Sequence, residues 1–277
     1  MVGHRGFDTS ARPRANRWHV METFESSDGT VIAFERTGSG PDLVLVGGAL
    51  SDRSSDRDLA FRLAPTFTVY WYDRRGRGAS GDSPPYSRDL EVEDLEALIL
   101  HIGGAASVFG RSTGGALALL AVAEGVAVTK LAAYEPPYIV DDSRPQPSHD
   151  LPARIRGMVA SGRPGDAVER YLVEEAAVSP AMVERMRAGA GWTAMEALAL
   201  TITHDLAIIG DGSTPDRLGK IGVPTLILDG AASPIWLRHA ALAATALIPG
   251  AQHLTLDNPA FGFDAASAAP VLAAFLS

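Results

Sequence analysis

The 277-residue chain contains no cysteine, and this absence excludes several kinds of site. There can be no disulfide scaffold, no thiolate nucleophile and no cysteine-ligated zinc or iron–sulfur cluster. Histidine occurs seven times, so acid–base chemistry based on imidazole stays open. The positions of these histidines decide whether any of them is used.

The chain also lacks an excess of positive charge. It has 24 basic and 33 acidic residues, which gives a formal net charge of −9 at pH 7. An acidic surface repels phosphate backbones and anionic lipids, which argues against nucleic acid or a membrane as a partner. We therefore expect a small-molecule substrate, while the oligomeric state stays unknown.

Long hydrophobic runs are missing as well. No stretch reaches the roughly 18 uninterrupted apolar residues of a membrane span, and residues 1–20 lack the apolar core of a secretory signal. We expect residues 1–20 to form a flexible extension and the protein to be cytoplasmic. No phosphate-binding loop, nucleotide fingerprint or metal-ligand spacing is present, so no cofactor and no metal are implied.

Short apolar runs rich in β-branched residues alternate with segments of helical period. This alternation predicts an α/β fold with a mostly parallel sheet and helices on both faces. The first two strands are joined across residues 27–29 with hairpin spacing, which indicates an antiparallel edge. The expected strands are residues 21–26, 31–36, 42–46, 68–73, 107–109, 130–134, 225–229 and 254–257. The expected helices between them are residues 52–63, 90–102, 114–124, 235–246 and 265–275.

The alternation stops after the strand at 130–134. Four helix-like segments follow, separated by proline and glycine, at residues 153–161, 166–175, 180–188 and 193–208. We expect residues 136–222 to form a helical lid. It would be inserted into a core made of residues 21–135 and 223–277.

Residues 110–114, Gly-Arg-Ser-Thr-Gly, fit the pattern G-x-S-x-G. They follow an apolar strand and open a helix, which is the strand–turn–helix context of a nucleophile elbow. Small residues suit this context because Ser112 has to sit in a strained turn where strand and helix approach closely. The alternative is a glycine-rich turn that carries no chemistry.

A second run, DRRGRGASG at residues 73–81, follows the strand that precedes the elbow unit. With these two motifs, the chain resembles the α/β-hydrolase superfamily over residues 21–277. The resemblance implies an α/β-hydrolase fold, with a mostly parallel eight-stranded sheet flanked by helices and a helical lid insertion.

The resemblance also implies an oxyanion hole. Residues 47–50, Gly-Gly-Ala-Leu, stand where the family usually has His-Gly. A backbone N–H of Ala49 or Gly48 would act together with the N–H of Thr113 on a substrate oxyanion. The alternative is a glycine turn that is needed only for packing.

The residues that should activate Ser112 are incomplete. A serine hydroxyl needs a base within hydrogen-bond reach, normally a histidine oriented by an acid. The family's acid position after strand 225–229 holds Ser233, although Glu135 suits the acid's place in another version of the fold. The position of the family's histidine is occupied by Phe261. The resemblance therefore implies a degenerate catalytic triad, in which the usual histidine is replaced.

Histidines elsewhere offer one candidate base. His253 precedes the last strand, on the order of 15 Å from the catalytic edge of the sheet, and no histidine follows it. His204 lies in an apolar lid segment that could extend over Ser112, with Asp205 adjacent. We keep His204 as a candidate catalytic residue and expect the remaining five to be solvated or structural.

Carboxylates are the other candidates for acid–base chemistry. Asp257, Asp229 and Glu135 each end a strand at the same edge of the sheet, so all three could face one cavity. A buried carboxylate with a raised pKa can abstract a proton from an activated carbon or hydroxyl. The alternative for each is to cap a turn or a helix.

The candidate substrate-binding residues are Arg111, Trp192, Phe261 and Ser233. Arg111 adds a cation beside Ser112, unless it pairs with one of the strand-end acids. Trp192 lies among methionines and alanines, a composition typical of a roomy apolar pocket and also of ordinary helix packing.

These features favour an α/β-hydrolase-fold enzyme that acts on a small apolar carbonyl-containing molecule. It would work as a lyase, cyclase or isomerase, using the oxyanion hole without a Ser-His-acid triad. Two alternatives stay open. One is a serine ester or lactone hydrolase with a relocated base such as His204, and the other is a catalytically silent ligand-binding protein.

Overall fold

The computed structural model describes residues 21–257 and 262–277. Eight strands within these residues form one sheet, in the order β1-β2-β4-β3-β5-β6-β7-β8. They are β1 (Glu22–Glu25), β2 (Val31–Gly38), β3 (Asp42–Val46), β4 (Thr68–Tyr72), β5 (Ala106–Arg111), β6 (Val128–Tyr134), β7 (Thr225–Gly230) and β8 (Gln252–Leu256). The pairs β1–β2 and β2–β4 are antiparallel and the others are parallel. The predicted mostly parallel eight-stranded sheet with an antiparallel edge is confirmed.

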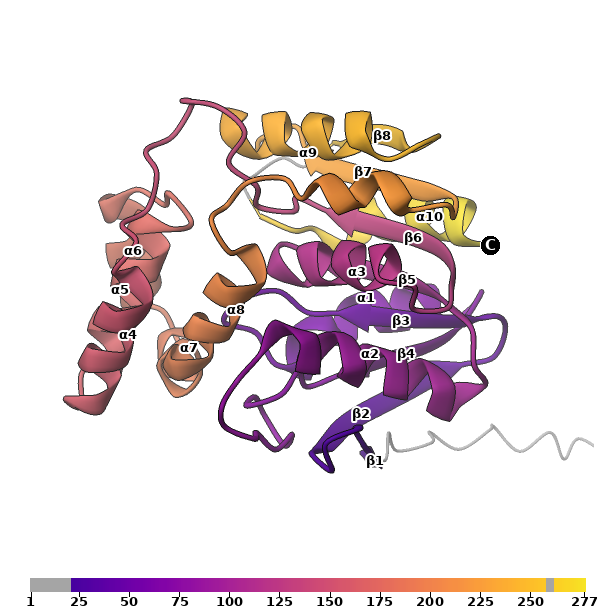
Figure 1. The fold of residues 1–277 in the computed structure, drawn as a ribbon, viewed down its shortest axis with the longest axis horizontal. Helices are drawn as coiled ribbons and strands as arrows, with labels where there is room; N and C mark the ends of the chain where they lie inside the picture. Colours follow the sequence, from indigo (N-terminus) through magenta and orange to yellow (C-terminus); the bar gives the residue numbers. More distant parts are fainter. Residues whose placement is uncertain (1–20, 258–261) are drawn as a thin grey trace, which may run out of the picture.

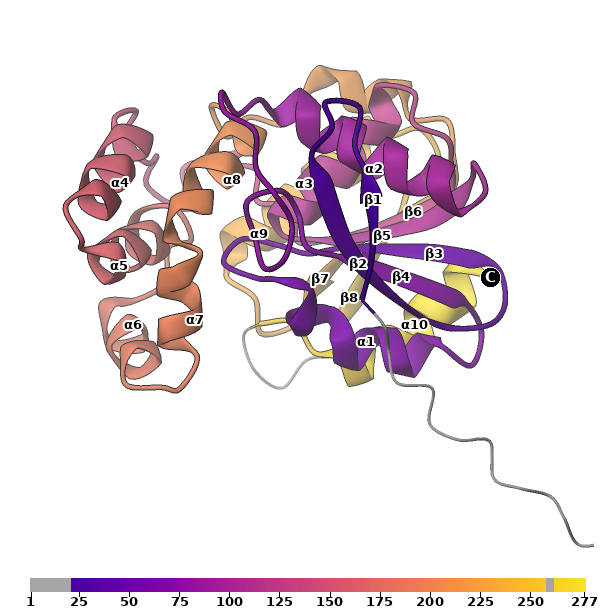
Figure 2. The same cartoon turned by 90° about the horizontal axis from the view of Figure 1, so that it is seen from below.

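Helices cover both faces of the sheet (Figures 1 and 2). They are α1 (Arg57–Leu63), α2 (Arg88–Ile102), α3 (Thr113–Ala123), α9 (Ile235–Leu247) and α10 (Ala265–Leu276), with short 3-10 helices η1 (Arg53–Asp56) and η3 (Asp216–Lys220). Strand β3 shows how the two cores arise. Its side chains alternate, so Val44 and Val46 pack in the core with α2, α3 and α9, while Leu43 and Leu45 pack with α1 and α10.

A helical segment, residues 136–222, connects β6 to β7 and is called the insert below. It contains α4 (Leu151–Ala160), α5 (Pro164–Glu174), α6 (Pro180–Arg187), α7 (Trp192–Ala197), η2 (Ala199–Thr201) and α8 (Ile202–Ile209). Many of its buried apolar side chains, such as Ile155, Tyr171 and Ile202, form a third cluster. Tyr138, Ile208, Leu218 and Ile221 instead pack in the core with α2, α3 and α9. In Figure 1 helices α4 to α7 stand to one side of the sheet.

One expected helix of the insert is divided. The periodicity predicts a single helix over residues 193–208, but α7 ends at Ala197 and α8 starts at Ile202. The Thr201 hydroxyl donates a hydrogen bond of 2.8 Å to the carbonyl oxygen of Leu198. Threonine side chains that bond to the preceding turn compete with regular helix geometry. The resulting 3-10 turn changes the direction of the chain just before α8.

The loop at residues 73–81 is held by its first residue. Asp73 accepts a 2.8 Å hydrogen bond from the N–H of Ala79, and the Ser80 hydroxyl donates to the Asp73 carbonyl oxygen at 2.6 Å. Gly78 has φ 54°, and a Cβ atom there would lie 2.2 Å from an Asp73 carboxylate oxygen. Only glycine therefore fits this position, which explains the spacing of the motif.

The same loop supplies arginines to a buried ionic network. Arg74 donates to Glu91 at 2.6 and 2.8 Å, and both Arg74 and Arg77 donate to Asp205 of α8 at 2.9 Å. The hydroxyl of Thr113, the first residue of α3, donates to the same Asp205 oxygen at 2.7 Å. The network thus ties the insert to the start of α3.

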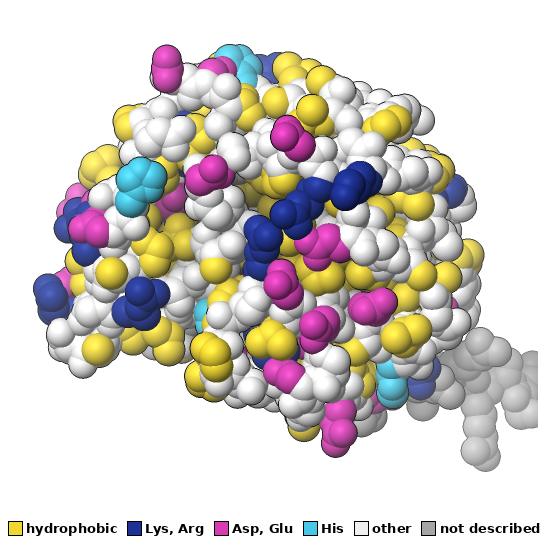
Figure 3. Space-filling view, viewed as in Figure 1, with side chains coloured by type: hydrophobic (Ala, Val, Ile, Leu, Met, Phe, Trp, Pro, Cys, Tyr) yellow, Lys and Arg dark blue, Asp and Glu magenta, His cyan; other side chains and the backbone are white. Residues whose placement is uncertain are grey.

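The surface facing the viewer in Figure 3 mixes both signs of charge. Acidic and basic side chains are interspersed there with apolar ones. Of the helices in residues 21–257 and 262–277, none combines the length and the hydropathy that crossing a membrane requires.

Candidate active site

Ser112 sits in a strained turn between β5 and α3. Its backbone has φ 52° and ψ −127°, a conformation that non-glycine residues rarely adopt. Its N–H donates to the carbonyl oxygen of Tyr134 on the neighbouring strand at 2.8 Å. A Cβ atom at Gly110 would lie 2.3 Å from the carbonyl oxygen of Gly114, and one at Gly114 would lie 2.4 Å from that of Gly47. The glycines of G-x-S-x-G are therefore required by this close approach.

The turn after β3 lies directly beside Ser112. A Cβ atom at Gly48 would be 3.2 Å from the Cβ of Ser112. The Gly48 carbonyl oxygen accepts hydrogen bonds of 2.7 Å from the Ser51 hydroxyl and from Arg77, which hold the turn in place. Thr113 begins α3, so its N–H belongs to the first turn, which has no intrahelical acceptor. The roles of Gly48, Ala49 and Thr113 as oxyanion donors stay predictions.

A cavity of about 180 Å³ opens beside Ser112. Parts of the chain far apart in sequence contribute to it, including three segments of the insert. Its lining consists of Arg111, Ser112, Tyr134, Glu135, Pro137, Tyr171, Glu175, Ala176, Ile209, Trp236, Leu237, Gly262 and Phe263. Most of these side chains are apolar, and none of the described residues in this lining is a histidine.

Glu135, one of the predicted candidates, lines this cavity directly after β6. It is only 5% exposed, and its carboxylate accepts hydrogen bonds from the Ser233 hydroxyl and, at 3.2 Å, from the N–H of Gly230. Burial raises the pKa of Glu135 despite these donors. Glu135 and Ser233 occupy the two positions where this fold can carry the acid of a triad. In the structure they form one hydrogen-bonded pair.

Arg111 also lines the cavity, but its partner is not one of the strand-end acids. Its Nε donates to Asp56 at 2.6 Å, and its guanidinium carbon lies 5.7 Å from the centre of the Phe263 ring. The Nη2 atom is buried and has no hydrogen-bond partner in the part of the chain that the structure describes. This guanidinium therefore keeps one unsatisfied donor.

Glu175 is a cavity residue that sequence reasoning missed. It follows α5, is 4% exposed, and burial raises its pKa to about 6 although the nearby Arg144 opposes the rise. A signal for it was present in the sequence. Tyr171 and Leu172 of α5 are buried, and positions three and four residues further lie on the same helix face, so Glu175 continues that face.

His204 is placed away from this cavity lining. Its ring stacks on Tyr86 with centroids 3.8 Å apart, and its Nε2 lies 3.7 Å from a carboxylate oxygen of Asp82. Burial lowers the pKa of His204. Its neighbour Asp205, rather than the imidazole, reaches the elbow through the hydroxyl of Thr113.

The remaining candidates also lie outside the lining. Asp257 is exposed just after β8. Trp192 is buried in the insert, where its indole N–H donates to Glu196 at 2.9 Å. His253 lies in β8 and contacts Asp229, with 3.0 Å between Nε2 and the carboxylate oxygen. Phe261 lies outside the described residues.

No arrangement for a metal ion is present among the residues that the structure describes, since they hold no suitable group of three histidine, aspartate or glutamate side chains. The site therefore consists of an elbow serine, two buried carboxyls and one guanidinium in a mostly apolar cavity.

Comparisons with known proteins agree with this fold. The family model described as "Alpha/beta hydrolase family" matches residues 43–265. The crystal structure of an alpha/beta hydrolase from Sphaerobacter thermophilus DSM 20745 is 50% identical, with a TM-score of 0.91, and the match covers 92% of this chain and 100% of that one. No curated protein matches the sequence.

More distant structures share the fold. A hydrolase from Pseudomonas aeruginosa PA01 is 24% identical with a TM-score of 0.65, and the match covers 90% of this chain and 92% of that one. The enol-lactonase from Burkholderia xenovorans LB400 is 23% identical with a TM-score of 0.60, over 85% and 91% of the two chains. At these identities the likeness concerns the fold alone.

Proposed function

Because the chain belongs to the alpha/beta hydrolase family, we propose that it is an enzyme that acts on a small, mostly apolar molecule with a carbonyl group, without a Ser-His-acid triad. One observation carries this proposal. The cavity beside the strained Ser112 contains two buried carboxyl groups, Glu135 and Glu175, and no histidine among its described lining residues.

The proposed chemistry is carbon acid–base chemistry of a lyase, cyclase or isomerase. The N–H groups of Thr113 and of Ala49 or Gly48 would hold the substrate carbonyl oxygen, and the Ser112 hydroxyl would donate a further hydrogen bond. A carboxylate takes a proton from the carbon next to the carbonyl, and the C–H electron pair moves to give an enolate on that oxygen. The proton then returns at another atom, or a group leaves from the adjacent carbon.

Two further groups suit such a substrate. The positive charge of Arg111 suits a polar group of the ligand, while Trp236, Leu237 and Phe263 would contact its apolar part. Tyr171 and Glu175 come from the insert, which supports a role of residues 136–222 as a lid over the cavity.

Ester or lactone hydrolysis is the second candidate function. The strained φ of 52° at Ser112 favours it, because hydrolases of this fold hold their nucleophile in such a turn. It would need a base other than the missing histidine. Loss of the histidine from a serine triad typically costs on the order of a millionfold in turnover.

The deciding experiment asks whether Ser112 acts as a covalent nucleophile or as a hydrogen-bond donor. The purified protein is treated with a fluorophosphonate and, separately, with p-nitrophenyl acetate, and its intact mass is recorded. Exchange of α-protons of small cyclic ketones in D₂O is followed by NMR for the wild type and Ser112→Ala. We expect no adduct on Ser112 and exchange that the variant reduces without abolishing. A burst of nitrophenol with an acyl adduct, both lost in the variant, would establish the hydrolase instead.

A further inference from the structure

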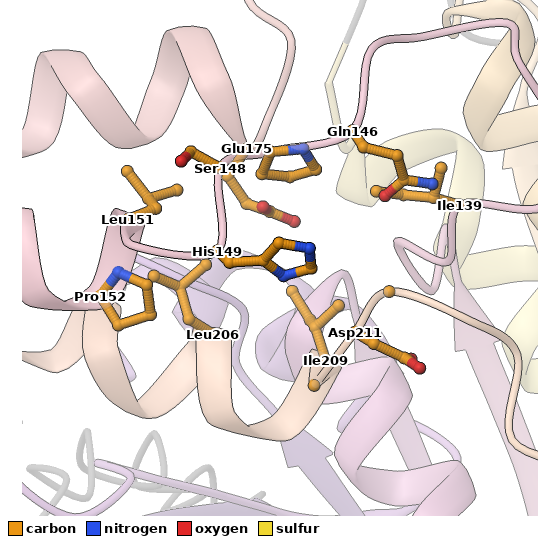
Figure 4. A pocket seen from close by; sticks show the side chains of 13 residues that line it. Ile139, Gln146, Ser148, His149, Leu151, Pro152, Glu175, Leu206, Ile209 and Asp211 are labelled. Carbon is orange, nitrogen blue, oxygen red and sulfur yellow. The ribbon is translucent and has the colours of Figure 1, made fainter.

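A second pocket adjoins the Ser112 cavity on the side of the insert. It has a volume of about 110 Å³, and we call it the outer pocket. Its lining consists of Ile139, Gln146, Pro147, Ser148, His149, Leu151, Pro152, Glu175, Leu206, Ile209, Gly210, Asp211 and Gly212 (Figure 4). Glu175 and Ile209 line both spaces. The side chain of Glu175 therefore stands at the boundary between the Ser112 cavity and the outer pocket.

Glu175 differs from the other buried acids of the molecule. Glu91, Asp94 and Asp205 each accept hydrogen bonds from arginine side chains, and Glu135 accepts them from a serine hydroxyl and a backbone N–H. The carboxyl oxygens of Glu175 have no such partner within residues 21–257 and 262–277. A largely buried carboxyl without a donor favours its neutral form, and this suits a group that takes up and releases a proton.

The charged groups around Glu175 make their hydrogen bonds elsewhere, although the charge of Arg144 is near enough to oppose the rise of its pKa. Arg144 donates to the backbone carbonyl oxygens of Glu174 and Glu175. On the side of the Ser112 cavity, Arg111 is paired with Asp56 and Glu135 with Ser233. On the other side, the outer pocket holds the titratable groups His149 and Asp211.

We propose that Glu175 is the catalytic residue that removes the proton from the substrate carbon and returns it, and that the outer pocket is the path by which this proton exchanges with solvent. The inference rests on the proposed function and specifies its acid–base group. In the step, the substrate C–H bond breaks, an O–H bond forms on Glu175, and the electron pair goes to the carbonyl oxygen.

Figure 4 shows the connection to the surface. The ring of His149 and the carboxyl of Glu175 are directed into the same pocket, and His149 is exposed. The raised pKa of Glu175, about 6, matches this task, because a base with a pKa near the working pH both holds and releases a proton.

The test uses a probe that needs only a positioned base. In the ring opening of 5-nitrobenzisoxazole, a base takes the C3 proton in the same step in which the C–H electron pair forms a nitrile and the N–O bond breaks, and a coloured cyanonitrophenolate is released. We expect the full-length protein to exceed free acetate at equal concentration, with a rate that rises with pH through about 6. Glu175→Gln should lower the rate by roughly 100-fold or more, and Glu175→Asp should restore part of it.

Glu169→Gln is the matched control, because Glu169 belongs to α5 but its carboxylate is exposed and bonds Arg187. It should leave the rate and its pH profile unchanged. The proposal is overturned if the protein does not exceed acetate, or if Glu175→Gln keeps the wild-type rate and profile. These outcomes are distinct from failure of the proposed function, which is read from an acyl or phosphonyl adduct on Ser112.

Discussion

The buried carboxyl of Glu175 should make the stability of the protein depend on pH, whether or not a substrate is bound. Its pKa rises from 4.5 in the unfolded chain to about 6 in the folded protein because burial disfavours the charged form. The folded state then binds more protons than the unfolded state between these values, so stability falls as the pH rises through this window. The shift corresponds to about 2 kcal/mol above pH 6.

We therefore predict that Glu175→Gln is more stable than the wild type at pH 7.5, by about 2 kcal/mol. The gain should disappear below pH 4.5, where the wild-type carboxyl is neutral in both states. Urea denaturation at a series of pH values measures the difference, with Glu169→Gln as the control. A difference that is the same at pH 4 and pH 7.5 would show that Glu175 is not held in an environment that opposes its charge.

The elbow glycines lead to a second prediction. A Cβ atom at Gly114 would lie 2.4 Å from the backbone carbonyl oxygens of both Val46 and Gly47, and backbone atoms have little room to move. Gly114→Ala should therefore destabilise the protein by about 3 kcal/mol or more. Gly157→Ala is the matched control, since Gly157 lies in α4 with nothing within 4 Å of its added Cβ. It should stabilise by about 0.5–1 kcal/mol, and equal thermal shifts for the two variants would contradict the steric argument.

The residues of the site differ in how far sequence could predict them. Ser112 and Glu135 directly follow strands, and the ends of parallel strands meet at one edge, so local patterns locate both. Glu175 reaches the cavity only through the packing of the insert, which no local pattern fixes. The ion pair between Arg111 and Asp56 could not be predicted from local sequence either. Asp56 precedes α1 and approaches β5 through the tertiary fold.

At the scale of elements, helix α8 is joined to α3 by a buried carboxylate and by Ile208, which packs in the apolar core that contains α3. Asp205 accepts from Thr113, Arg74 and Arg77. Burial opposes its ionisation, but Arg77 and Arg74 hold the pKa of Asp205 below its ordinary value. Such a group contributes stability at neutral pH that is lost as the pH falls through its folded-state pKa.

Asp205→Asn should therefore destabilise the protein by roughly 3–5 kcal/mol at pH 7, because two buried guanidinium groups lose a charged partner. Thermal unfolding followed by circular dichroism measures the loss. Asp211→Asn is the control, since Asp211 is exposed in the loop after α8 and accepts hydrogen bonds from Ser213. If both variants unfold at the wild-type temperature, the network does not hold α8 in place.

The elements themselves were largely predictable, and their exceptions have local causes. Apolar runs located the inner parallel strands because a buried parallel strand needs apolar residues on both faces, and hairpin spacing located the antiparallel edge. The division of residues 193–208 was missed because the Thr201 hydroxyl adds a bond that hydrophobic periodicity does not register. The 3-10 helix η3 was missed because five residues are too few to show a helical period.

At the scale of the whole molecule, the three apolar clusters differ in how closely they are joined to one another. The two clusters on the sheet share its strands, whereas the cluster of the insert joins α4 to α8 with only Ala49 and Leu50 from the turn after β3. A unit with its own small core can open without the rest. Helix α8 is connected to both parts, because Asp205 binds it to the start of α3 and Ile208 packs in the core that contains α3.

Native-state hydrogen exchange should resolve this organisation. We expect the amides of α4, α5 and α6 to exchange together and earlier than those of α3 and β5, since they lose only the insert's cluster on opening. Helix α8 should exchange with α3 in the wild type and with α4 to α6 in Asp205→Asn, because the variant lacks the carboxylate that joins the two parts. Equal protection of α4 and α3 would instead mean that the insert and the sheet unfold as one unit, and that the cavity between them opens only when the whole protein does.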